Sequence, residues 1–382
     1  MTRSLAERVV GLKPSATVEM TERVRNARAA GRKIIGLSSG DPNIETDPRI
    51  IAAAEQAMRG GDTHYGPPAG LPALREAIVR RDAVRSGVSY DPADVIVTPG
   101  GKFALLTALM GTIQTGDEVL IPEPGWVSYG PCVRLCGGTP VDISMLDRID
   151  VAALERAVSP RTRAIIVNSP VNPTGRVFTA AEIAAVLAFA QQHDLWIVFD
   201  QVYSDLLYEG TFPSPQRLPG GQERVFVIDS LSKTFGMTGW RLGYLLTPAG
   251  LSKTILKFIQ HSIYCVPGFI QAAGITALSL EHELVPRYRG TFRARLETAA
   301  TRLSAVPGIT CSVPPATFYL FPSVAAPDAE VAKRWLDTID VATVPGSLFG
   351  ASGAGHLRLS LTCSDRDLDD ALDGIARIGI AA

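Results

Sequence analysis

The sequence lacks the features that mark membrane proteins and nucleic-acid-binding proteins. No hydrophobic run approaches the length that spans a bilayer, and the N-terminal residues carry no hydrophobic segment typical of a signal peptide. Lys and Arg number 37 and Asp and Glu number 38, so the formal net charge is −1. A chain without excess positive charge has no general attraction for nucleic acid or for anionic lipid. We therefore expect neither nucleic acid nor a membrane as a partner.

Cysteine is also scarce, and its distribution excludes a disulfide framework. The five cysteines are odd in number and scattered along the chain. Cys132 and Cys136 lie four residues apart, but no second Cys/His pair completes a zinc site. The histidines show no metal-ligand spacing either, so we expect no bound metal. A reducing compartment suits this cysteine usage, and we predict a cytoplasmic protein.

The order of apolar segments predicts an α/β fold. The length of 382 residues accommodates a large domain and a smaller one. Short apolar strands alternate with helical segments between about residues 94 and 247, which predicts a mostly parallel central sheet with helices on both faces. The last part of the chain predicts a small α+β domain. We expect an N-terminal segment, 1–45, that packs with the small domain, then a large domain, 46–285, and a small C-terminal domain, 286–382.

One stretch, residues 229–244, carries the strongest chemical signal. It reads Asp-Ser-Leu-Ser-Lys-Thr-Phe-Gly-Met-Thr-Gly-Trp-Arg-Leu-Gly-Tyr. A lysine that forms a Schiff base must be held in place and partly desolvated, so that its amine loses a proton near neutral pH. The hydroxyl of Ser230 and the guanidinium of Arg241 suit a phosphate. Lys233 alone fits a solvated loop lysine, but with these neighbours it indicates an anchor for pyridoxal 5'-phosphate (PLP).

The same stretch resembles the lysine signature of the class I/II aminotransferases, which are PLP-dependent enzymes of fold type I. Ser-Leu-Ser-Lys at 230–233 and Met-Thr-Gly-Trp-Arg-Leu-Gly at 237–243 match its restricted positions. The likeness extends from about Leu12 to the last helix. With Leu-Lys-Pro-Ser-Ala-Thr at 12–17, the layout is most similar to the aspartate/aromatic branch found in bacteria. The resemblance implies the fold-type I architecture and PLP bound to Lys233 as a Schiff base.

A glycine turn and an aromatic residue complete the expected phosphate and ring contacts. Gly100, Gly101 and Lys102 follow a short strand and open a helix, whose free N–H groups and positive dipole end favour an anion. The turn matches the Gly-Gly-Lys phosphate turn of some of these enzymes. The resemblance also implies that Trp126 stacks on the pyridine ring and contacts the substrate. A core or interface position is the alternative for this indole.

Polar residues at strand ends are the expected partners of the PLP ring. Asp200 ends the apolar strand 195–199, and a carboxylate there can keep the pyridine nitrogen protonated. The resemblance implies that Tyr203 and Asn172 hydrogen-bond to the phenolic oxygen, although Asn172 also fits a plain Asn-Pro turn. We predict Lys233, Asp200 and Tyr203 as the catalytic residues. The family commonly has Glu after the aspartate, and for Gln201 we expect altered local hydrogen bonds without loss of chemistry.

Three further residues are expected to contact the substrate or a second subunit. Arg358 is a lone arginine in an apolar strand, and the resemblance implies that it grips the substrate α-carboxylate. A structural salt bridge is the alternative. By the same resemblance, Gly40 meets the substrate carboxylate through its backbone. Tyr65 reaches the cofactor phosphate of another subunit, which implies a homodimer with shared active sites.

The activity implied by the resemblance is transamination. The amino group of an L-amino acid would pass to a 2-oxo acid by a ping-pong mechanism, in which Lys233 moves the α-proton. Two alternatives remain: another fold-type I reaction, such as a C–S lyase, decarboxylase or synthase, and a non-catalytic ligand sensor. The sequence assigns no positive charge to a distal carboxylate, so aspartate, aromatic, methionine and alanine donors all stay open.

Overall fold

The computed structural model describes residues 5–12, 14 and 16–380. Lys13 and Ser15, which belong to the early run at 12–17, lie outside the described residues. Within the described part of the chain, none of the helices is both long and apolar enough to cross a membrane.

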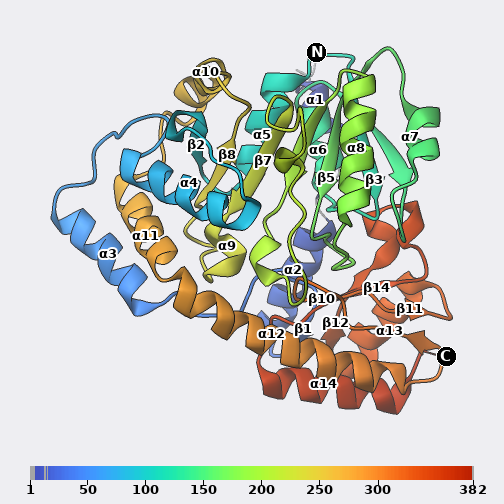
Figure 1. Ribbon diagram of the computed structural model, residues 1–382. Helices are drawn as coiled ribbons and strands as arrows, with labels where there is room; N and C mark the ends of the chain where they lie inside the picture. The colour runs from blue at the N-terminus through green and yellow to red at the C-terminus, as the bar shows by residue number, and fades with distance from the viewer. Residues whose placement is uncertain (1–4, 13, 15, 381–382) are drawn as a thin grey trace, which may run out of the picture.

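A seven-stranded sheet forms the centre of the larger body (Figure 1). In spatial order its strands are β2 (Val95–Thr98), β8 (Gly243–Leu246), β7 (Val225–Ser230), β6 (Trp196–Asp200), β5 (Thr162–Asn168), β3 (Glu118–Glu123) and β4 (Thr139–Ser144). Within this sheet β8 alone runs antiparallel to its neighbours, β2 and β7. The predicted mostly parallel sheet is therefore confirmed.

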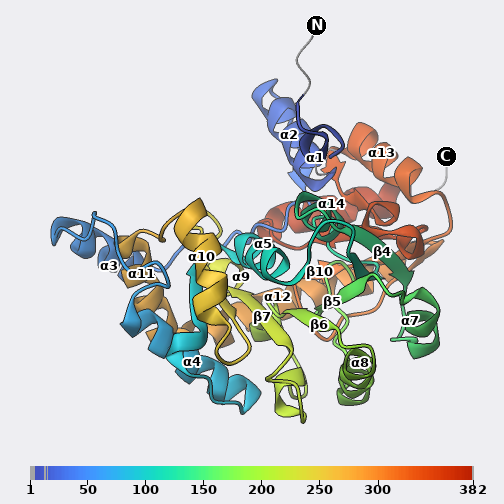
Figure 2. The same cartoon turned by 90° about the horizontal axis from the view of Figure 1, so that it is seen from above.

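Two helical layers cover the faces of the sheet, as Figure 2 shows from above. Val227 packs toward one layer and Ile228 toward the other, because successive side chains of a strand point to opposite faces. One layer contains α5 (Gly101–Thr112), α6 (Tyr129–Leu135) and α10 (Ser252–Ser262). The other contains α3 (Pro48–Arg59), α4 (Pro72–Ser86), α7 (Val151–Ala157), α8 (Ala180–Gln192) and α11 (Gly268–Ser279). Helices thus cover both faces, as predicted.

The carboxyl ends of the parallel strands bring the polar residues together. The paired register places Asn168, at the end of β5, opposite Asp200, at the end of β6. Ser230 ends the next strand, β7, and the four-residue helix α9 (Leu231–Thr234) follows it directly. In an open α/β sheet this edge is where ligands bind. The sheet therefore gathers these side chains at one edge, although they are far apart in the sequence.

A second, smaller body has its own hydrophobic core. It contains short strands β9 (Ile309–Thr310), β10 (Tyr319–Leu320), β11 (Ser323–Val324), β12 (Val341–Ala342), β13 (Val344–Pro345) and β14 (Leu357–Ser360), with helices α13 (Asp328–Ile339) and α14 (Asp365–Ile378). From the N-terminal part, β1 (Ile35–Gly36) pairs in parallel with β12. The predicted α+β body is confirmed.

One long helix joins the two bodies. The helix α12 (Glu281–Ser304) contributes Leu284 to the larger core and Leu296 to the smaller one. The remaining elements are α1 (Glu7–Val10), α2 (Ala16–Ala29) and the 3-10 helices η1 (Pro92–Asp94), η2 (Ser204–Leu206), η3 (Pro215–Arg217), η4 (Gly346–Phe349) and η5 (Ala351–Gly353). The chain limits predicted for the domains stay a prediction.

The strand β8 begins two residues after Arg241. Arg241 has φ +54°, in the left-handed region that a strand cannot include. Arg241 is thereby turned out of the sheet, beside the start of α5.

Candidate active site

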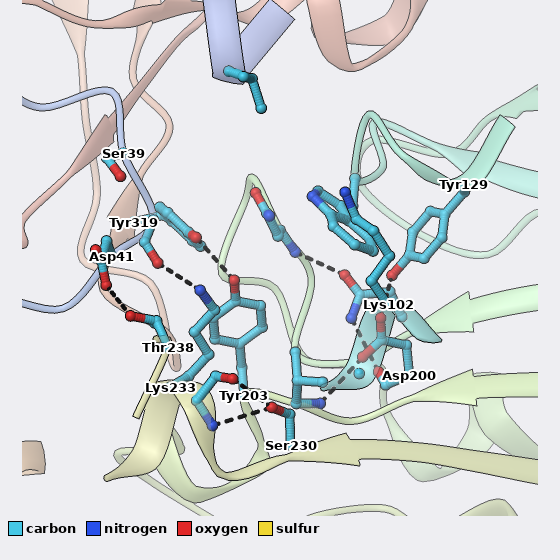
Figure 3. Close-up of a pocket in the computed structure, with 18 of the residues that line it drawn as sticks. Ser39, Asp41, Lys102, Tyr129, Asp200, Tyr203, Ser230, Lys233, Thr238 and Tyr319 are labelled. Atoms are coloured by element: carbon cyan, nitrogen blue, oxygen red, sulfur yellow. Dashed lines mark hydrogen bonds between the residues drawn. The ribbon is translucent and has the colours of Figure 1, made fainter. Parts of the chain in front are cut away.

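A cavity of about 390 Å³ opens at the carboxyl edge of the sheet, with walls from both bodies (Figure 3). Most of the residues predicted from the sequence line it: Gly40, Gly101, Lys102, Trp126, Asn172, Asp200, Tyr203, Ser230, Lys233, Arg241 and Arg358. Gly100 and Tyr65 are not among its lining residues. The predicted site residues therefore converge although they come from seven separate parts of the chain.

Lys233 projects into the cavity from α9. The helix begins where the Ser230 side chain accepts a hydrogen bond from Ser232 N at 3.1 Å. Lys233 Nζ donates to the Gly40 carbonyl oxygen at 2.6 Å. Burial, aided by the nearby cations and opposed by Asp41, lowers the pKa of Lys233 to about 8. An appreciable fraction of this amine is therefore unprotonated near neutral pH, as Schiff-base formation requires.

Asp200 is a buried carboxylate at the end of β6. Its Oδ2 accepts from Tyr129 Oη at 2.8 Å, and its Oδ1 accepts from Val202 N at 3.2 Å. Burial nevertheless raises the pKa of Asp200 to about 6. Among the residues that the structure describes, no cation offsets this burial. The carboxylate is thus suited to a cationic ligand atom, such as the protonated nitrogen of a pyridine ring.

The start of α5 forms an anion cradle with Arg241. Gly100 has φ +86° and precedes the helix, and a Cβ at this position would lie 2.7 Å from Arg241 Nη2. The Arg241 guanidinium donates to Thr238 O at 2.9 Å and Pro99 O at 3.3 Å, which holds it beside the free N–H groups of the helix. Ser230 Oγ lies at the same end, 2.7 Å from Ser232 Oγ. These donors fit a phosphate.

Trp126 and Lys102 lie together on the cavity wall. Lys102 Nζ is 5.0 Å from the centre of the Trp126 ring, and the indole meets Tyr129 edge-on at 5.5 Å. The indole packs partly against the core and partly lines the cavity. This position leaves an aromatic surface for a flat ring.

Arg358 is a buried cation on the cavity wall. Only 2% of its surface is exposed, and it donates to Asn172 Oδ1 at 3.1 Å and to Ser38 O. The rings of Tyr319 and Phe349 lie 4.7 and 4.9 Å from its guanidinium carbon. In the described part of the chain no carboxylate pairs with Arg358, and its Nε lacks a hydrogen-bond partner. The structural salt bridge considered from the sequence is therefore absent there, and the guanidinium fits a ligand carboxylate.

Two tyrosines of the site were missed by the sequence reasoning. Tyr129 donates to Asp200, and Tyr319 Oη lies 2.8 Å from Tyr203 Oη. A Cβ at Gly40 would collide with Tyr319 Oη, so Gly40 is needed for a close approach and not merely for a turn. Tyr129 stands three residues after Trp126, and this closeness to a predicted site residue could have indicated that Tyr129 belongs to the site. Tyr319 lies in the aromatic run 318–321, whose sequence alone indicates no role in the site.

Tyr65 and Gln201 both lie away from this cavity. The Tyr65 side chain is on the surface, with 85% of the residue exposed, and its ring meets Tyr264 edge-on at 4.9 Å. Gln201 is buried, and its Nε2 donates to Asp82 Oδ1 at 3.1 Å. The predicted contact of Tyr65 with a second subunit remains a prediction.

The cavity satisfies the requirements of a PLP site. It combines a lysine of lowered pKa, a buried carboxylate free of cations in the described residues, an anion cradle and an aromatic wall. These features, on a mostly parallel sheet with a smaller α+β body, define a PLP-dependent enzyme of fold type I.

Comparison with known proteins identifies the family. The chain matches the model of the class I and II aminotransferases over residues 32–375, and it belongs to that family. It is 39% identical over 387 residues to an aspartate aminotransferase of Geobacillus stearothermophilus, with 98% of each chain covered. It is 36% identical to an aspartate/prephenate aminotransferase of Thermus thermophilus, covering 98% of this chain and 99% of the relative.

Solved structures agree with this assignment. An aspartate aminotransferase from Thermus thermophilus with maleate has a TM-score of 0.93 and 35% identity, covering 98% of this chain and all of the other. An aromatic aminotransferase from Pyrococcus horikoshii has a TM-score of 0.87 and 34% identity, covering 93% of this chain and 98% of the other. The chain is a PLP-dependent aminotransferase, which moves an amino group from an amino acid to a 2-oxo acid. Transamination thus replaces the lyase, decarboxylase and sensor alternatives.

Proposed function

We propose that the amino donor is a dicarboxylic L-amino acid, with aspartate the first to test. The supporting observation is the set of cations on the cavity wall, which in the described residues comprises Lys102, Lys233, Arg241 and Arg358. Arg241 belongs to the phosphate cradle, Arg358 binds the α-carboxylate of the substrate, and Lys233 carries out the amine chemistry. The backbone of Lys102 belongs to the glycine turn, but its side chain lies over Trp126. Its ammonium is therefore available for the distal carboxylate of the substrate.

Relatives support a dicarboxylic substrate. Two of them are named for aspartate, and the Thermus thermophilus structure holds maleate, which is a dicarboxylate. An ammonium and a guanidinium on the wall of one cavity suit a ligand with two carboxylates.

We assign the cofactor contacts as follows. Bound PLP supplies an electron sink, which stabilises negative charge at the substrate α-carbon. Asp200 would keep the ring nitrogen protonated, and Trp126 would supply an aromatic surface for the ring. Asn172 and Tyr203 donate toward the phenolic oxygen. The phosphate is held by the N–H groups of Gly101 and Lys102, by Ser230 and by Arg241, whereas the N–H of Gly100 already donates to Thr98 O at 2.7 Å.

Lys233 and Arg358 carry out the substrate steps in this proposal. Arg358 binds the α-carboxylate as a fork, which orients the bond between the α-carbon and its hydrogen. Lys233 Nζ accepts that proton, because its lowered pKa leaves a fraction of the amine unprotonated near neutral pH. The carbonyl of Gly40, 2.6 Å from Nζ, holds the amine at the substrate side of the cavity.

We further propose a homodimer in which Tyr65 contacts the phosphate of the other subunit. Tyr65 is exposed and is not among the residues that line the cavity of its own chain, which supports this assignment.

We also propose domain limits at 1–45, 46–285 and 286–382. The two separate hydrophobic cores and the pairing of β1 with β12 support them. A cytoplasmic location is proposed from the odd number of cysteines.

Donor kinetics of the wild type and of Lys102→Gln test the proposed donor. We expect parallel double-reciprocal lines, as in a ping-pong mechanism, and the highest kcat/KM with aspartate. Lys102→Gln should lower kcat/KM for aspartate about 10- to 100-fold, since a hydrogen bond to a charged group contributes about 1.5–3 kcal/mol. Alanine, which has no distal carboxylate, serves as the control substrate. An equal loss of kcat/KM for aspartate and for alanine would indicate that Lys102 contacts the cofactor instead.

A further inference from the structure

Two arginines of α4 are buried behind the segment that carries Lys233. The side chains of Arg81 and Arg85 are only 3% and 11% exposed. Neither lines the active-site cavity. A buried guanidinium is tolerated only with anionic partners and satisfied donors. The positions of their partners therefore show what this pair of arginines holds.

The first partner, Asp229, precedes Lys233 by four residues. Its Oδ2 accepts from Tyr244 Oη at 2.9 Å and from Arg81 Nη1 at 3.4 Å, and it forms an ion pair with Arg85 Nη2 at 2.8 Å. Its Oδ1 accepts from Ser230 N at 2.6 Å. The arginines are thus connected, through one carboxylate, to the backbone at the start of the lysine segment.

The second partner, Asp205, contacts the residue that follows Lys233. Thr234 Oγ1 donates to Asp205 Oδ2 at 2.6 Å, and Arg81 Nη2 donates to the same oxygen. Arg85 Nη1 lies 3.5 Å from Asp205 Oδ1. Burial pushes the pKa of Asp205 up, but the charges of Arg81 and Arg85 outweigh it and hold the pKa below its usual value. Asp205 is therefore an anion that both arginines share.

The same arginines also hold the segment that carries Asp200 and Tyr203. Arg85 Nη1 donates to Ser204 Oγ at 2.6 Å, and Arg85 Nη2 donates to Asp82 Oδ1 at 2.8 Å. Gln201 Nε2 donates to that same Asp82 oxygen at 3.1 Å. Three carboxylates, those of Asp82, Asp205 and Asp229, already share the two arginines. A neutral side chain at position 201 suits this group, because it adds no further negative charge.

We propose that Arg81 and Arg85 are positioning residues, which fix Lys233 against Asp200 and Tyr203 through Asp229–Ser230 and Asp205–Thr234. The proposal rests on the assignment of Lys233 as the PLP lysine. The two segments follow the neighbouring strands β6 and β7 and both line the cavity, and a shared pair of rigid guanidinium groups sets the distance between them. Held in this way, Lys233 Nζ stays buried at Gly40 O, and burial is the main cause of its lowered pKa.

The test removes one hydrogen bond and leaves the charges in place. Thr234→Val keeps the side-chain volume but cannot donate to Asp205, and Thr234→Ser restores a hydroxyl. Thr247→Val is the matched control, because it removes another buried hydroxyl, which donates to Asp94 O at 3.2 Å. The other charged groups that face Lys233, namely Asp41, Lys102, Arg241 and Arg358, stay unchanged in all three variants.

The readout is the pH dependence of the rate at which the full-length, cofactor-depleted protein binds PLP, because this step needs the unprotonated amine. We expect the midpoint for Thr234→Val to move up by about one pH unit, so that the rate at pH 7 falls about tenfold. Thr234→Ser and Thr247→Val should stay within about twofold of the wild type. An unchanged midpoint in Thr234→Val would overturn the proposal.

A second variant covers the case in which Thr234→Val fails to fold. Arg85→Lys keeps the charge but loses the fork, so its single ammonium cannot serve Asp229 and Ser204 together. The same upward shift is expected, and no shift would overturn the proposal. Failure of the underlying assignment looks different: Lys233→Ala would then bind PLP with the spectrum and rate of the wild type.

Discussion

The hydrogen bond from Tyr129 to Asp200 gives a quantitative prediction about the pH range of the enzyme. Tyr129→Phe removes the donor at 2.8 Å and keeps the ring. A hydrogen bond to a charged group contributes about 1.5–3 kcal/mol, and 1.36 kcal/mol corresponds to one pKa unit. Because the lost bond favours the ionised form, the pKa of Asp200 should rise from about 6 by about 1–2 units in the cofactor-depleted protein.

The sign of the effect follows from the direction of this shift. Below its pKa Asp200 is neutral and cannot pair with a protonated ring nitrogen, so PLP affinity falls as the pH drops through that value. In Tyr129→Phe the fall should begin about 1–2 pH units higher, while affinity well above pH 8 stays close to that of the wild type. The dissociation constant of PLP, measured by fluorescence titration from pH 5 to pH 9, reports the shift.

A matched control separates this effect from a general loss of packing. Tyr90→Phe removes another tyrosine hydroxyl, at a residue that does not line the cavity, and should leave the pH dependence of PLP binding unchanged. If Tyr129→Phe and the wild type lose PLP over the same pH range, the hydrogen bond from Tyr129 does not control the charge of Asp200 and the reasoning is refuted.

Three further substitutions test other parts of the site. Arg358→Lys should raise KM about 10- to 100-fold for both donor and 2-oxo acid, because both carry the carboxylate next to the reacting carbon, without weakening PLP binding in a direct titration. Gly40→Ala should lower kcat, since its Cβ would displace Tyr319 from Tyr203; a pre-steady-state rate equal to that of the wild type would contradict this contact. Gln201→Glu should lower the free energy of unfolding by about 1–3 kcal/mol at pH 8, because it adds a carboxylate beside Asp82. This loss should shrink toward pH 5, as the new side chain, whose pKa is raised, takes up a proton; urea denaturation at both pH values measures it.

The sequence was sufficient for the features that depend on local pattern. Apolar strands that alternate with helices predicted the sheet and its two helical layers, and the signature around Lys233 predicted that this lysine and Arg241 lie at one cavity. Both follow from short-range chemistry: the continuous apolar runs of strands that are buried on both faces, and the neighbours that a reactive amine needs.

The missed features depend on contacts between distant segments. Tyr129 meets Asp200 across 71 residues, and Tyr203 meets Tyr319 across 116. The same holds for Arg81, which on its own helix looks like an ordinary surface charge but meets Asp205, 124 residues away. Such pairs depend on how the strands are ordered and how the two bodies close, and nothing in the local sequence of either partner specifies this.

The role of Lys233 is tested most directly by the absorbance of the purified protein. The wild type should show the band of bound PLP. That band should fall when aspartate is added, while a pyridoxamine phosphate band rises, and it should return with 2-oxoglutarate. Lys233→Ala should not complete this cycle. The proposed role of Lys233 is contradicted if Lys233→Ala cycles like the wild type, or if no amino acid converts the bound cofactor in the wild type.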